Sequence, residues 1–534
     1  MSDRTGSEGP EEPPAGGGGR RSTGRSTAIF AAWTALSRVV GLAREILAAA
    51  LYGTQGAINA FVIAFQVPNL LRSLVADSAL SAAFVPVYAR LQEEGRHREA
   101  ERLVGTLIGV ITLGLGGLSL VAIITAPWVM PLFAPGLPED LIDELILLSR
   151  IMFPIVAMLG LTGLVAAVLQ AAGEFGGTAF VPVLWNLVII GVMGLATPFV
   201  SGGEAVTMYA VGIVLGTAAQ LAWLVPSFRR KGRFPISLSP SGPHMRRVLV
   251  MMLPVTLGLG LINVNLSINS VFATLVSEES PRAIDAAFRI YLLPQGIFSV
   301  AVATVLFPAI SRLAAREDRD GLRRAVSDGT RLIFFMLLPC SALLLVLTEP
   351  VVRLVFQRGE FDAASTVLTS EALFFFALGL AFNGASLLVI RAFFALQLPW
   401  TPTKVAGLGV VLTVVLNAVL YGPLGTGGIT LATSITSAVT LLVLMWLLAR
   451  ELGGLHGTEI QDGILRCVVA SGISALLAWS SWTVIDEALG RSTPAQIVAM
   501  TVAILAAVVA YLAAAQAFGI REIRTLSGLR RPLR

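Results

Sequence analysis

Two arginines and one glutamate stand inside the apolar stretch SRVVGLAREILAAALYG, residues 37–53. Arg38, Gly41 and Glu45 are spaced i, i+3, i+7, so a helix places them on one face. Arg44 lies about 100° around the same helix from Glu45. A charged side chain within an apolar helix is costly, and it usually faces a partner or a cavity. The stretch therefore predicts a helix that lines a polar site inside a bundle.

Two more apolar stretches carry charges of the same kind. NLLRSLVADS contains Arg72 and Asp77, and AAFRIYLLPQG contains Arg289. With Arg44 these make three arginines against two carboxylates. The guanidinium fork matches the oxygen atoms of phosphate, so the positive surplus predicts an anionic ligand such as a pyrophosphate. We expect Glu45 and Asp77 to orient the arginines rather than to perform chemistry.

An arginine in an apolar segment can instead reach the membrane interface or form a structural ion pair. We expect this of Arg353 and Arg391, which lie close to the ends of such segments. Both interpretations stay open for Arg38 and Arg150. For the three arginines of the predicted site a ligand is the favoured interpretation, and Arg38 is included with them.

The composition indicates what kind of molecule positions these charges. Of 534 residues, 55% are hydrophobic and only 13% are charged, whereas about a quarter of a soluble domain is charged. We therefore predict an all-α integral membrane protein. The sequence contains no GxxxxGKS/T, HExxH, CxxC or GxSxG motif, which are signatures of ATPases, metal sites and nucleophilic enzymes. We expect no enzyme activity, no cofactor, no resident metal and no nucleic-acid partner.

Segments of about 20 apolar residues can cross a bilayer core of about 30 Å. Fourteen are predicted, beginning near residues 27, 56, 103, 141, 178, 206, 247, 283, 332, 364, 403, 428, 466 and 495. Most of the 38 lysines and arginines fall in the two tails and the even-numbered connections. Only Arg282, Arg358 and Arg491 fall in the odd-numbered ones. Because positive residues stay cytoplasmic, both termini are predicted to lie in the cytoplasm.

The chain also matches itself at an offset of 222 to 226 residues. FVPVYARL pairs with LFPAISRL, PWVMPLFAPG with PVVRLVFQRG, and INAF with IDAA. An offset of six helices keeps both copies in one orientation, which predicts two parallel six-helix lobes around a central cavity plus two C-terminal helices, a transporter design. The predicted organisation is a disordered cytoplasmic tail (1–26), an N-lobe (27–235), a C-lobe (236–455), the last two helices (456–520) and a basic cytoplasmic tail (521–534). Gly41, Pro68 and Pro294 are candidate hinges, because helices bend at such residues.

Several of these motifs resemble one known family. SRVVGLAREILAAALYG, INAFVIAFQVPNLLRSLVADSALSAAFVPVYARL, LFPAISRL and FQRGEF are similar to the MurJ/MviN lipid II flippases of the multidrug/oligosaccharidyl-lipid/polysaccharide exporter superfamily. The resemblance implies fourteen transmembrane helices and a cationic cavity. It implies transport of lipid II, the undecaprenyl-pyrophosphate-linked peptidoglycan precursor, from the inner to the outer leaflet of a bacterial cell membrane by alternating access, in cell wall biogenesis and cell shape. The family's essential arginines fall on Arg44, Arg72 and Arg289, with its serine-arginine pair at Ser37 and Arg38. The resemblance also implies that the last two helices form a groove for the lipid tail.

The sequence departs from the family pattern at three positions. Glu45 stands where an aspartate is usual, Asp77 stands within Ala-Asp-Ser rather than Ala-Glu-Gly, and Phe288 replaces an aspartate. A sodium site of some members needs acidic residues in the seventh and eleventh spans, and this sequence has none there. We expect the asparagines of these spans to form hydrogen bonds between helices instead; they are Asn263, Asn265, Asn269 and Asn417.

Two other functions stay open from the sequence. One is export of another lipid-linked glycan or of a drug by the same superfamily, although a drug exporter favours acidic or apolar cavities. The other is a non-transporting scaffold that binds cell-wall synthesis and division proteins. Beyond lipid II, the predicted partners are membrane lipids, to which the arginine-rich N-terminal tail is expected to bind.

Overall fold

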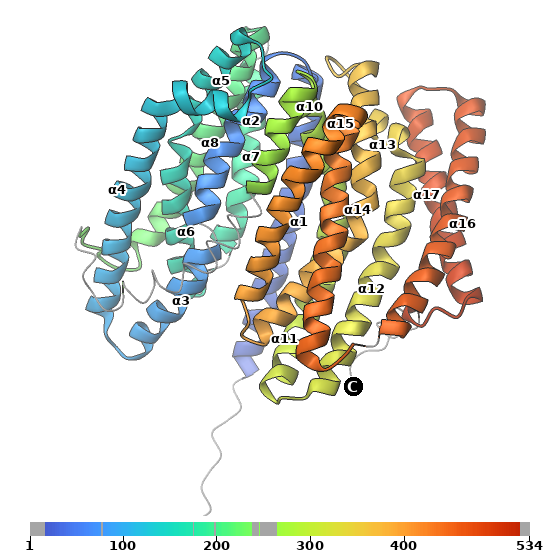
Figure 1. Ribbon diagram of the computed structural model, residues 1–534. Coiled ribbons are helices and arrows are strands. Elements are labelled where there is room, and N and C mark those ends of the chain that lie inside the picture. Colours follow the sequence, from blue (N-terminus) through green and yellow to red (C-terminus); the bar gives the residue numbers. More distant parts are fainter. Residues whose placement is uncertain are drawn as a thin grey trace, which may run out of the picture.

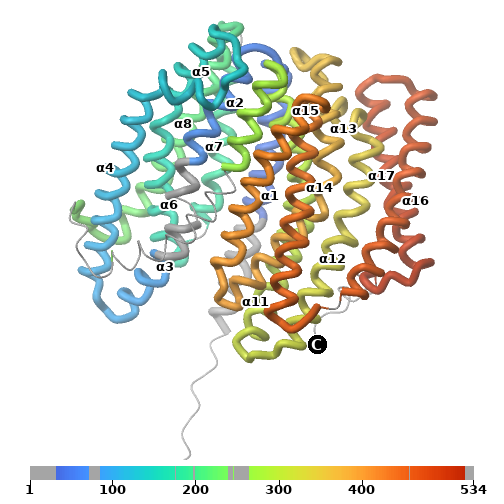
Figure 2. Tube along the Cα trace, viewed as in Figure 1, coloured from blue at the N-terminus to red at the C-terminus, as the bar shows by residue number. Residues whose placement is uncertain are grey.

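The computed structural model describes residues 17–75, 78–174, 176–196, 199–237, 245, 264–455 and 457–523, and Figure 2 draws the uncertainly placed residues in grey. Side chains are described from residue 32 onward, except those of residues 71–83. Every regular element in these ranges is a helix. All of the helices run roughly along one direction, so the bundle has two ends (Figure 1). The C-terminal end of the chain marks the lower end of the molecule in that view.

The helices of the N-terminal half are α1 (Gly17–Tyr52), α2 (Ala57–Val75), α3 (Ser78–Glu93), α4 (His97–Val129), the 3₁₀ turn η1 (Met130–Phe133), α5 (Glu139–Met152), α6 (Ile155–Ala171), α7 (Gly176–Ala196) and α8 (Gly202–Arg229). An unlabelled helix, Val264–Val276, follows. The rest are α10 (Ser280–Pro294), the π-helical turn η2 (Gln295–Ser299), α11 (Val300–Ala315), α12 (Arg319–Val346), α13 (Thr348–Phe356), α14 (Ala363–Ala395), α15 (Trp400–Leu452), α16 (Gly457–Leu489) and α17 (Thr493–Ala517).

The predicted multi-span membrane fold is confirmed. Ten helices of the described residues are long and apolar enough to cross a membrane, and α2 and Val264–Val276 contain shorter apolar segments. The long helix α15 contains two of the predicted spans, joined at Gly425, whose φ of 52° interrupts the helical backbone. Together with the charged α1, these elements account for all fourteen predicted segments. The start of the seventh, near residue 247, lies outside the described residues.

The structure differs from the prediction at two places. The first helix begins at Gly17, so residues 17–26 of the predicted disordered tail continue α1. Adding a turn to an existing helix costs far less than starting one. The short helix α13 was not foreseen, because its apolar residues merge with those of the preceding span. α13 lies in the connection between α12 and α14, at the upper end of the molecule (Figure 1).

Apolar side chains both fill the interior and cover the outside of this bundle. One large core is built from α10–α15, and two smaller cores lie among α1–α8. Two further clusters attach the α16–α17 hairpin to α12 and α13. Large apolar side chains such as Leu195, Val305 and Val509 are nevertheless more than two-thirds exposed. A soluble protein rarely leaves so much apolar surface in water, whereas lipid tails are a suitable solvent for it.

The internal repeat falls on matching elements. FVPVYARL lies in α3 and LFPAISRL in α11, and each helix contains the aligned proline, Pro86 or Pro308. Directly after Pro294 the backbone adopts the π-helical turn η2 before continuing as α11. Proline removes a backbone donor and such turns commonly mark bends. The hinge role of Pro294, Pro68 and Gly41 stays a prediction.

Candidate functional site

Two charged residues of α1 lie at the centre of the bundle. Arg44 and Glu45 are 6% and 5% exposed. They line a cavity of about 350 Å³ whose other walls come from α2, α7, α8, α10, α14, α15 and Val264–Val276. Two arginines of α10, Arg282 and Arg289, line the same cavity. The predicted meeting of α1 with the eighth span is therefore present in the structure.

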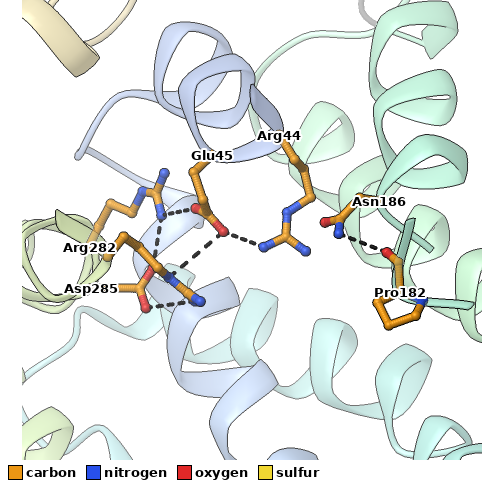
Figure 3. Close-up of polar contacts among 7 residues, drawn as sticks. Arg44, Glu45, Pro182, Asn186, Arg282 and Asp285 are labelled. Atoms are coloured by element: carbon orange, nitrogen blue, oxygen red, sulfur yellow. Dashed lines mark hydrogen bonds and ion pairs between the residues drawn. The ribbon is translucent and has the colours of Figure 1, made fainter. Parts of the chain in front are cut away.

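Glu45 is the common partner of three arginines (Figure 3). Arg44, its neighbour on α1, pairs with Oε1. From α10, Arg282 Nη1 lies 3.5 Å from Glu45 Oε2, and Arg289 Nε lies 3.8 Å from Glu45 Oε1. The first contact lies within one helix, whereas the other two join the N-terminal and C-terminal halves of the chain.

Asp285 supplies a second carboxylate between the arginines of α10. Its Oδ2 lies 3.1 Å from Arg282 Nη1, and its Oδ1 accepts a hydrogen bond of 3.0 Å from Arg289 Nη2. These residues are spaced i, i+3, i+7, which places them on one face of α10. Asp285 therefore bridges the two arginines from within α10. Phe288 instead packs on Tyr291 and Phe376.

Arg282 was predicted in an outer connection, and this prediction is wrong. The side chain is 2% exposed and lies inside α10. The helix begins at Ser280, and the Asn59 side chain accepts a 3.0 Å hydrogen bond from the Arg282 amide. Arg282 was not predicted as a site residue, because it lies at the polar edge of the eighth apolar segment. Its spacing from Asp285 and Arg289 was a signal that could have found it.

The described cluster has an excess of positive charge and of hydrogen-bond donors. Three arginines face the two carboxylates of Glu45 and Asp285. Among the described residues, buried donor atoms of Arg44 (Nε), Arg282 (Nε, Nη2) and Arg289 (Nε) have no hydrogen-bond partner. A buried donor without a partner is costly, so these atoms are suited to an acceptor that enters the cavity. The Arg289 side chain is 35% exposed and is the most accessible of the three.

Aromatic and amide side chains hold Arg44 in place. Its Cζ lies 4.7 Å from the ring centroid of Trp185 on α7, a cation–π contact. One turn earlier on α1, Gly41 faces the Asn186 amide, whose Nδ2 donates a 2.9 Å hydrogen bond to the Pro182 carbonyl (Figure 3). α1 and α7 therefore pack closely on the side of Arg44 that faces away from α10.

The other predicted site residues lie outside this cluster or outside the description. Arg38 has an exposed side chain, and its guanidinium lies against Gly296 of η2, so it does not line the cavity. Arg72 lies in α2, but its side chain is not among those described, and Asp77 is not described at all. Pro68 is buried in the same helix. The structure thus brings together Arg44, Glu45 and Arg289 of the predicted set.

Above the cavity, the two halves of the chain meet in a close backbone contact. The Glu360 amide donates a 2.9 Å hydrogen bond to the Ala50 carbonyl. Gly53 and Gly359 have φ values of 58° and 60°, and a Cβ on either would lie within 2.4 Å of a carbonyl oxygen of the other segment. Thr54 Oγ1 also lies 2.8 Å from Ser365 Oγ. Only glycine permits this approach, which closes the upper end of the molecule.

The predicted hydrogen bonds between helices are present for two of the four asparagines, Asn269 and Asn417. Asn265 Oδ1 is buried and has no hydrogen-bond partner among the described residues. Asn417 on α15 donates to Asn269 Oδ1 at 2.9 Å, and Asn269 donates to Thr433 Oγ1 at 2.9 Å. Asn263 lies outside the described residues. Within the described ranges, no group of three or more His, Cys, Asp or Glu side chains is placed to bind a metal ion.

Comparison with known proteins assigns the family. A family model described as "Lipid II flippase MurJ" matches residues 48–517. The chain belongs to the MurJ lipid II flippase family. It is 31% identical over 511 residues to a probable lipid II flippase MurJ of Rhizobium meliloti (strain 1021), with 93% of this chain and 94% of the relative covered. It is 32% identical over 432 residues to the lipid II flippase MurJ of Burkholderia cenocepacia, covering 79% and 82%.

Solved structures of the family and superfamily share the fold. A lipid II flippase MurJ in an inward closed conformation matches with a TM-score of 0.78 and 22% identity, covering 92% of this chain and 98% of that one. An inward-facing multidrug resistance transporter of the MATE family matches with a TM-score of 0.68 and 15% identity, covering 82% and 99%. The greater likeness is to the flippase, in agreement with the sequence comparisons.

Proposed function

We propose that this protein is a transporter of lipid II, in which the arginines of the central cavity bind the pyrophosphate. Family membership over most of the chain carries the assignment of the substrate. The observation that carries the site is the cavity itself, where three arginines with unpartnered donors face only two carboxylates. Arginine binds phosphate oxygens in a bidentate manner, and a pyrophosphate offers enough oxygen atoms for all three side chains.

The same contacts couple binding to movement of the lobes. Glu45 of α1 binds Arg282 and Arg289 of α10. These ion pairs, with the Gly53–Gly359 contact above them, keep the upper end closed. A pyrophosphate competes with Glu45 and Asp285 for the arginines. Its binding weakens the contact between the lobes and allows the upper end to open, which is alternating access between two parallel repeats.

The orientation follows from the distribution of charge. The arginine-rich connections after α3, α8 and α11 lie at the lower end of the molecule (Figure 1). Under the positive-inside rule this end faces the cytoplasm together with both termini, and the closed upper end faces outward in a bacterial inner membrane. The lipid tail stays in the bilayer, with the α16–α17 hairpin as the predicted groove for it.

Two alternatives are less well supported. A drug exporter for cationic compounds gains nothing from a cavity with excess positive charge. A scaffold without transport activity has no use for buried arginine donors without partners, which cost stability. Binding to cell-wall synthesis or division proteins stays a prediction without a described surface to support it.

The test is the exposure of lipid II on the outer face of cells depleted of their own flippase. The wild type is compared with Arg44→Ala and Arg289→Ala at matched membrane levels. Arg391→Ala is the control, because Arg391 lies in a span but binds Thr304 Oγ1 at 3.1 Å outside the cavity. We expect exposure with the wild type and the control, and at least about a tenfold loss with either cavity variant, the loss of one charged contact. No exposure with the folded wild type would refute the proposed substrate, and full exposure with both cavity variants would refute the proposed site.

A further inference from the structure

A second cavity, of about 360 Å³, lies at the upper end of the molecule, away from the central site. It is lined by residues of α13, of the α13–α14 connection, of the first turns of α14 and α17, and of the α16–α17 turn. Its three basic residues are Arg353, Arg358 and Arg491, and its acidic residue is Glu349. Arg358 and Arg491 are two of the few basic residues that the sequence places in outer connections. They are 133 positions apart, and the fold brings them to one cavity.

Arg353 is buried and has an unused donor. Its side chain is 9% exposed, and no hydrogen-bond partner of its buried Nε lies among the described residues. Arg353 Nη2 lies 3.5 Å from Glu349 Oε1, and Arg353 Cζ lies 5.8 Å from the ring centroid of Trp482. As predicted for a residue at a span end, Arg353 forms an ion pair, but this contact satisfies only one edge of the guanidinium. The Nε atom is available to an acceptor in the cavity.

The other two arginines are exposed, and their partners lie close to them in the chain. Arg358 Nη2 donates to the Leu354 carbonyl, four residues earlier on the chain. Arg491 is 73% exposed, and its Nε lies 3.7 Å from Asp486 Oδ2, which is too long for a strong hydrogen bond. The lining residues therefore carry two excess positive charges, and one when Asp486 is included. Arg491 can therefore turn toward an anion without breaking a strong contact, whereas Arg358 would exchange its hydrogen bond to the Leu354 carbonyl for one to the anion.

The backbone adds to the positive potential of the cavity. α17 begins at its wall with Thr493, and its N-cap residue Ser492 makes no side-chain capping hydrogen bond. Amides at a helix N-terminus favour an anion. Pro494 has no amide, so those of the first turn belong to Thr493 and Ala495. α14 also begins there, but the Asp362 side chain already accepts the Ser365 amide. The cavity thus combines a buried arginine, two exposed arginines and one helix terminus without a side-chain cap.

The surroundings indicate the kind of anion. Below the charged rim, Val367, Ile497 and Val484 are more than half exposed, and such apolar surface in this protein faces lipid tails. Trp482 lies beside Arg353, as tryptophans commonly do at the level of lipid headgroups. An anion at this cavity would therefore have its charge among the arginines while an attached acyl chain lies against the apolar surface below.

We propose that this cavity binds the phosphate of an anionic membrane lipid, such as phosphatidylglycerol, in the leaflet at the upper end of the bundle. The bound lipid would bridge α13 and the α16–α17 hairpin. The proposal is independent of lipid II transport, because it concerns residues that do not line the central cavity.

Native mass spectrometry of the purified full chain in detergent tests this, with phosphatidylglycerol or phosphatidylcholine added. The test variant is Arg358→Gln/Arg491→Gln. The control is Arg324→Gln/Arg521→Gln, which loses the same charge from two exposed arginines with similar partners, a carbonyl four residues earlier and one carboxylate at 3.7 Å. Arg491→Gln alone is included because so exposed a side chain has little packing to lose.

We expect the wild type and the control to bind phosphatidylglycerol in preference to phosphatidylcholine. In the test variant, affinity for phosphatidylglycerol should fall about tenfold or more, since two charge-assisted contacts to the phosphate are lost. The affinity of Arg491→Gln alone should lie between that of the wild type and that of the test variant. Equal binding by test and control variants, or no preference for phosphatidylglycerol, would overturn the proposal. The proposal would also be overturned if inorganic phosphate at millimolar concentration displaced the lipid and bound more tightly than it. The site would then be one for a soluble anion.

Discussion

Replacing Glu45 with glutamine removes the one negative charge that α1 offers to α10, and the effect on the lobes can be estimated. The contact with Arg44 lies within α1 and is the same whether the lobes are together or apart. The contacts with Arg282 and Arg289, at 3.5 and 3.8 Å, exist only when the two lobes are together. At an effective dielectric constant of about 20, each is worth about 4 kcal/mol before desolvation is counted. Removing one member of a buried pair typically costs about 3–5 kcal/mol.

The smaller of these values already changes the conformational equilibrium strongly. A loss of about 3 kcal/mol shifts the ratio of closed to open upper ends about a hundredfold, at about 1.4 kcal/mol per factor of ten. The separation can be measured by electron paramagnetic resonance between spin labels on Glu139→Cys and Ser492→Cys, both exposed at the upper end. The native thiols Cys340 and Cys467 are replaced by alanine so that only the labels react.

We expect Glu45→Gln to add a population with a longer distance across the upper end. Glu45→Asp is the matched control, since it keeps the charge, and we expect it to stay close to the wild-type distribution. If Glu45→Gln and the wild type had the same distance distribution and the same thermal stability, the ion pairs across the lobes would not hold the closed state. The reasoning from the structure would then be wrong.

Three other perturbations follow from single contacts. Gly359→Ala places a Cβ about 2.2 Å from the Ala50 carbonyl, so the same spin-label distance should lengthen, and an unchanged distance would contradict the close contact. Glu522→Gln removes the 2.7 Å ionic partner of the buried Arg331 and leaves it, among the described residues, only Glu459 Oε2 at 3.5 Å, so protease cleavage near the end of α17 should become faster, by an amount that reflects about 1.5 kcal/mol. Asp362→Ala removes the N-cap of α14 and should cost about 1 kcal/mol in unfolding free energy. The Ser365 amide lowers the pKa of the Asp362 carboxyl, so this cost should be present at neutral pH and disappear as the pH falls below about 4; a cost independent of pH would contradict it.

The sequence predicted the parts of the fold that depend on local composition. Apolar segments of bilayer length, the aligned prolines Pro86 and Pro308, and the repeated motifs around them all lie in helices as expected. The span predicted to begin near residue 428 starts just after the interruption at Gly425, although both spans belong to one long helix, α15. These features depend on residues close together in the chain, which is why a sequence alone can indicate them.

The site was predicted only in part, because its geometry depends on distant segments. Arg44, Glu45 and Arg289 were expected in one cavity, since charges in apolar helices need partners. The role of Arg282 was missed because the end of a helix cannot be fixed to within one turn from hydropathy. Arg358 and Arg491 come from two loops whose meeting depends on how the α16–α17 hairpin packs against α13. No pattern in the sequence predicts how the hairpin packs against α13.

The central claim is that the cavity arginines bind the lipid-linked pyrophosphate, and its most direct test is the affinity of the purified protein for lipid II. Binding is measured by native mass spectrometry for the wild type, Arg289→Gln and the control Arg391→Gln. We expect Arg289→Gln to bind lipid II about tenfold more weakly or worse, as the loss of one charge-assisted contact implies, while the control binds as the wild type does. Equal affinity of all three proteins would contradict it.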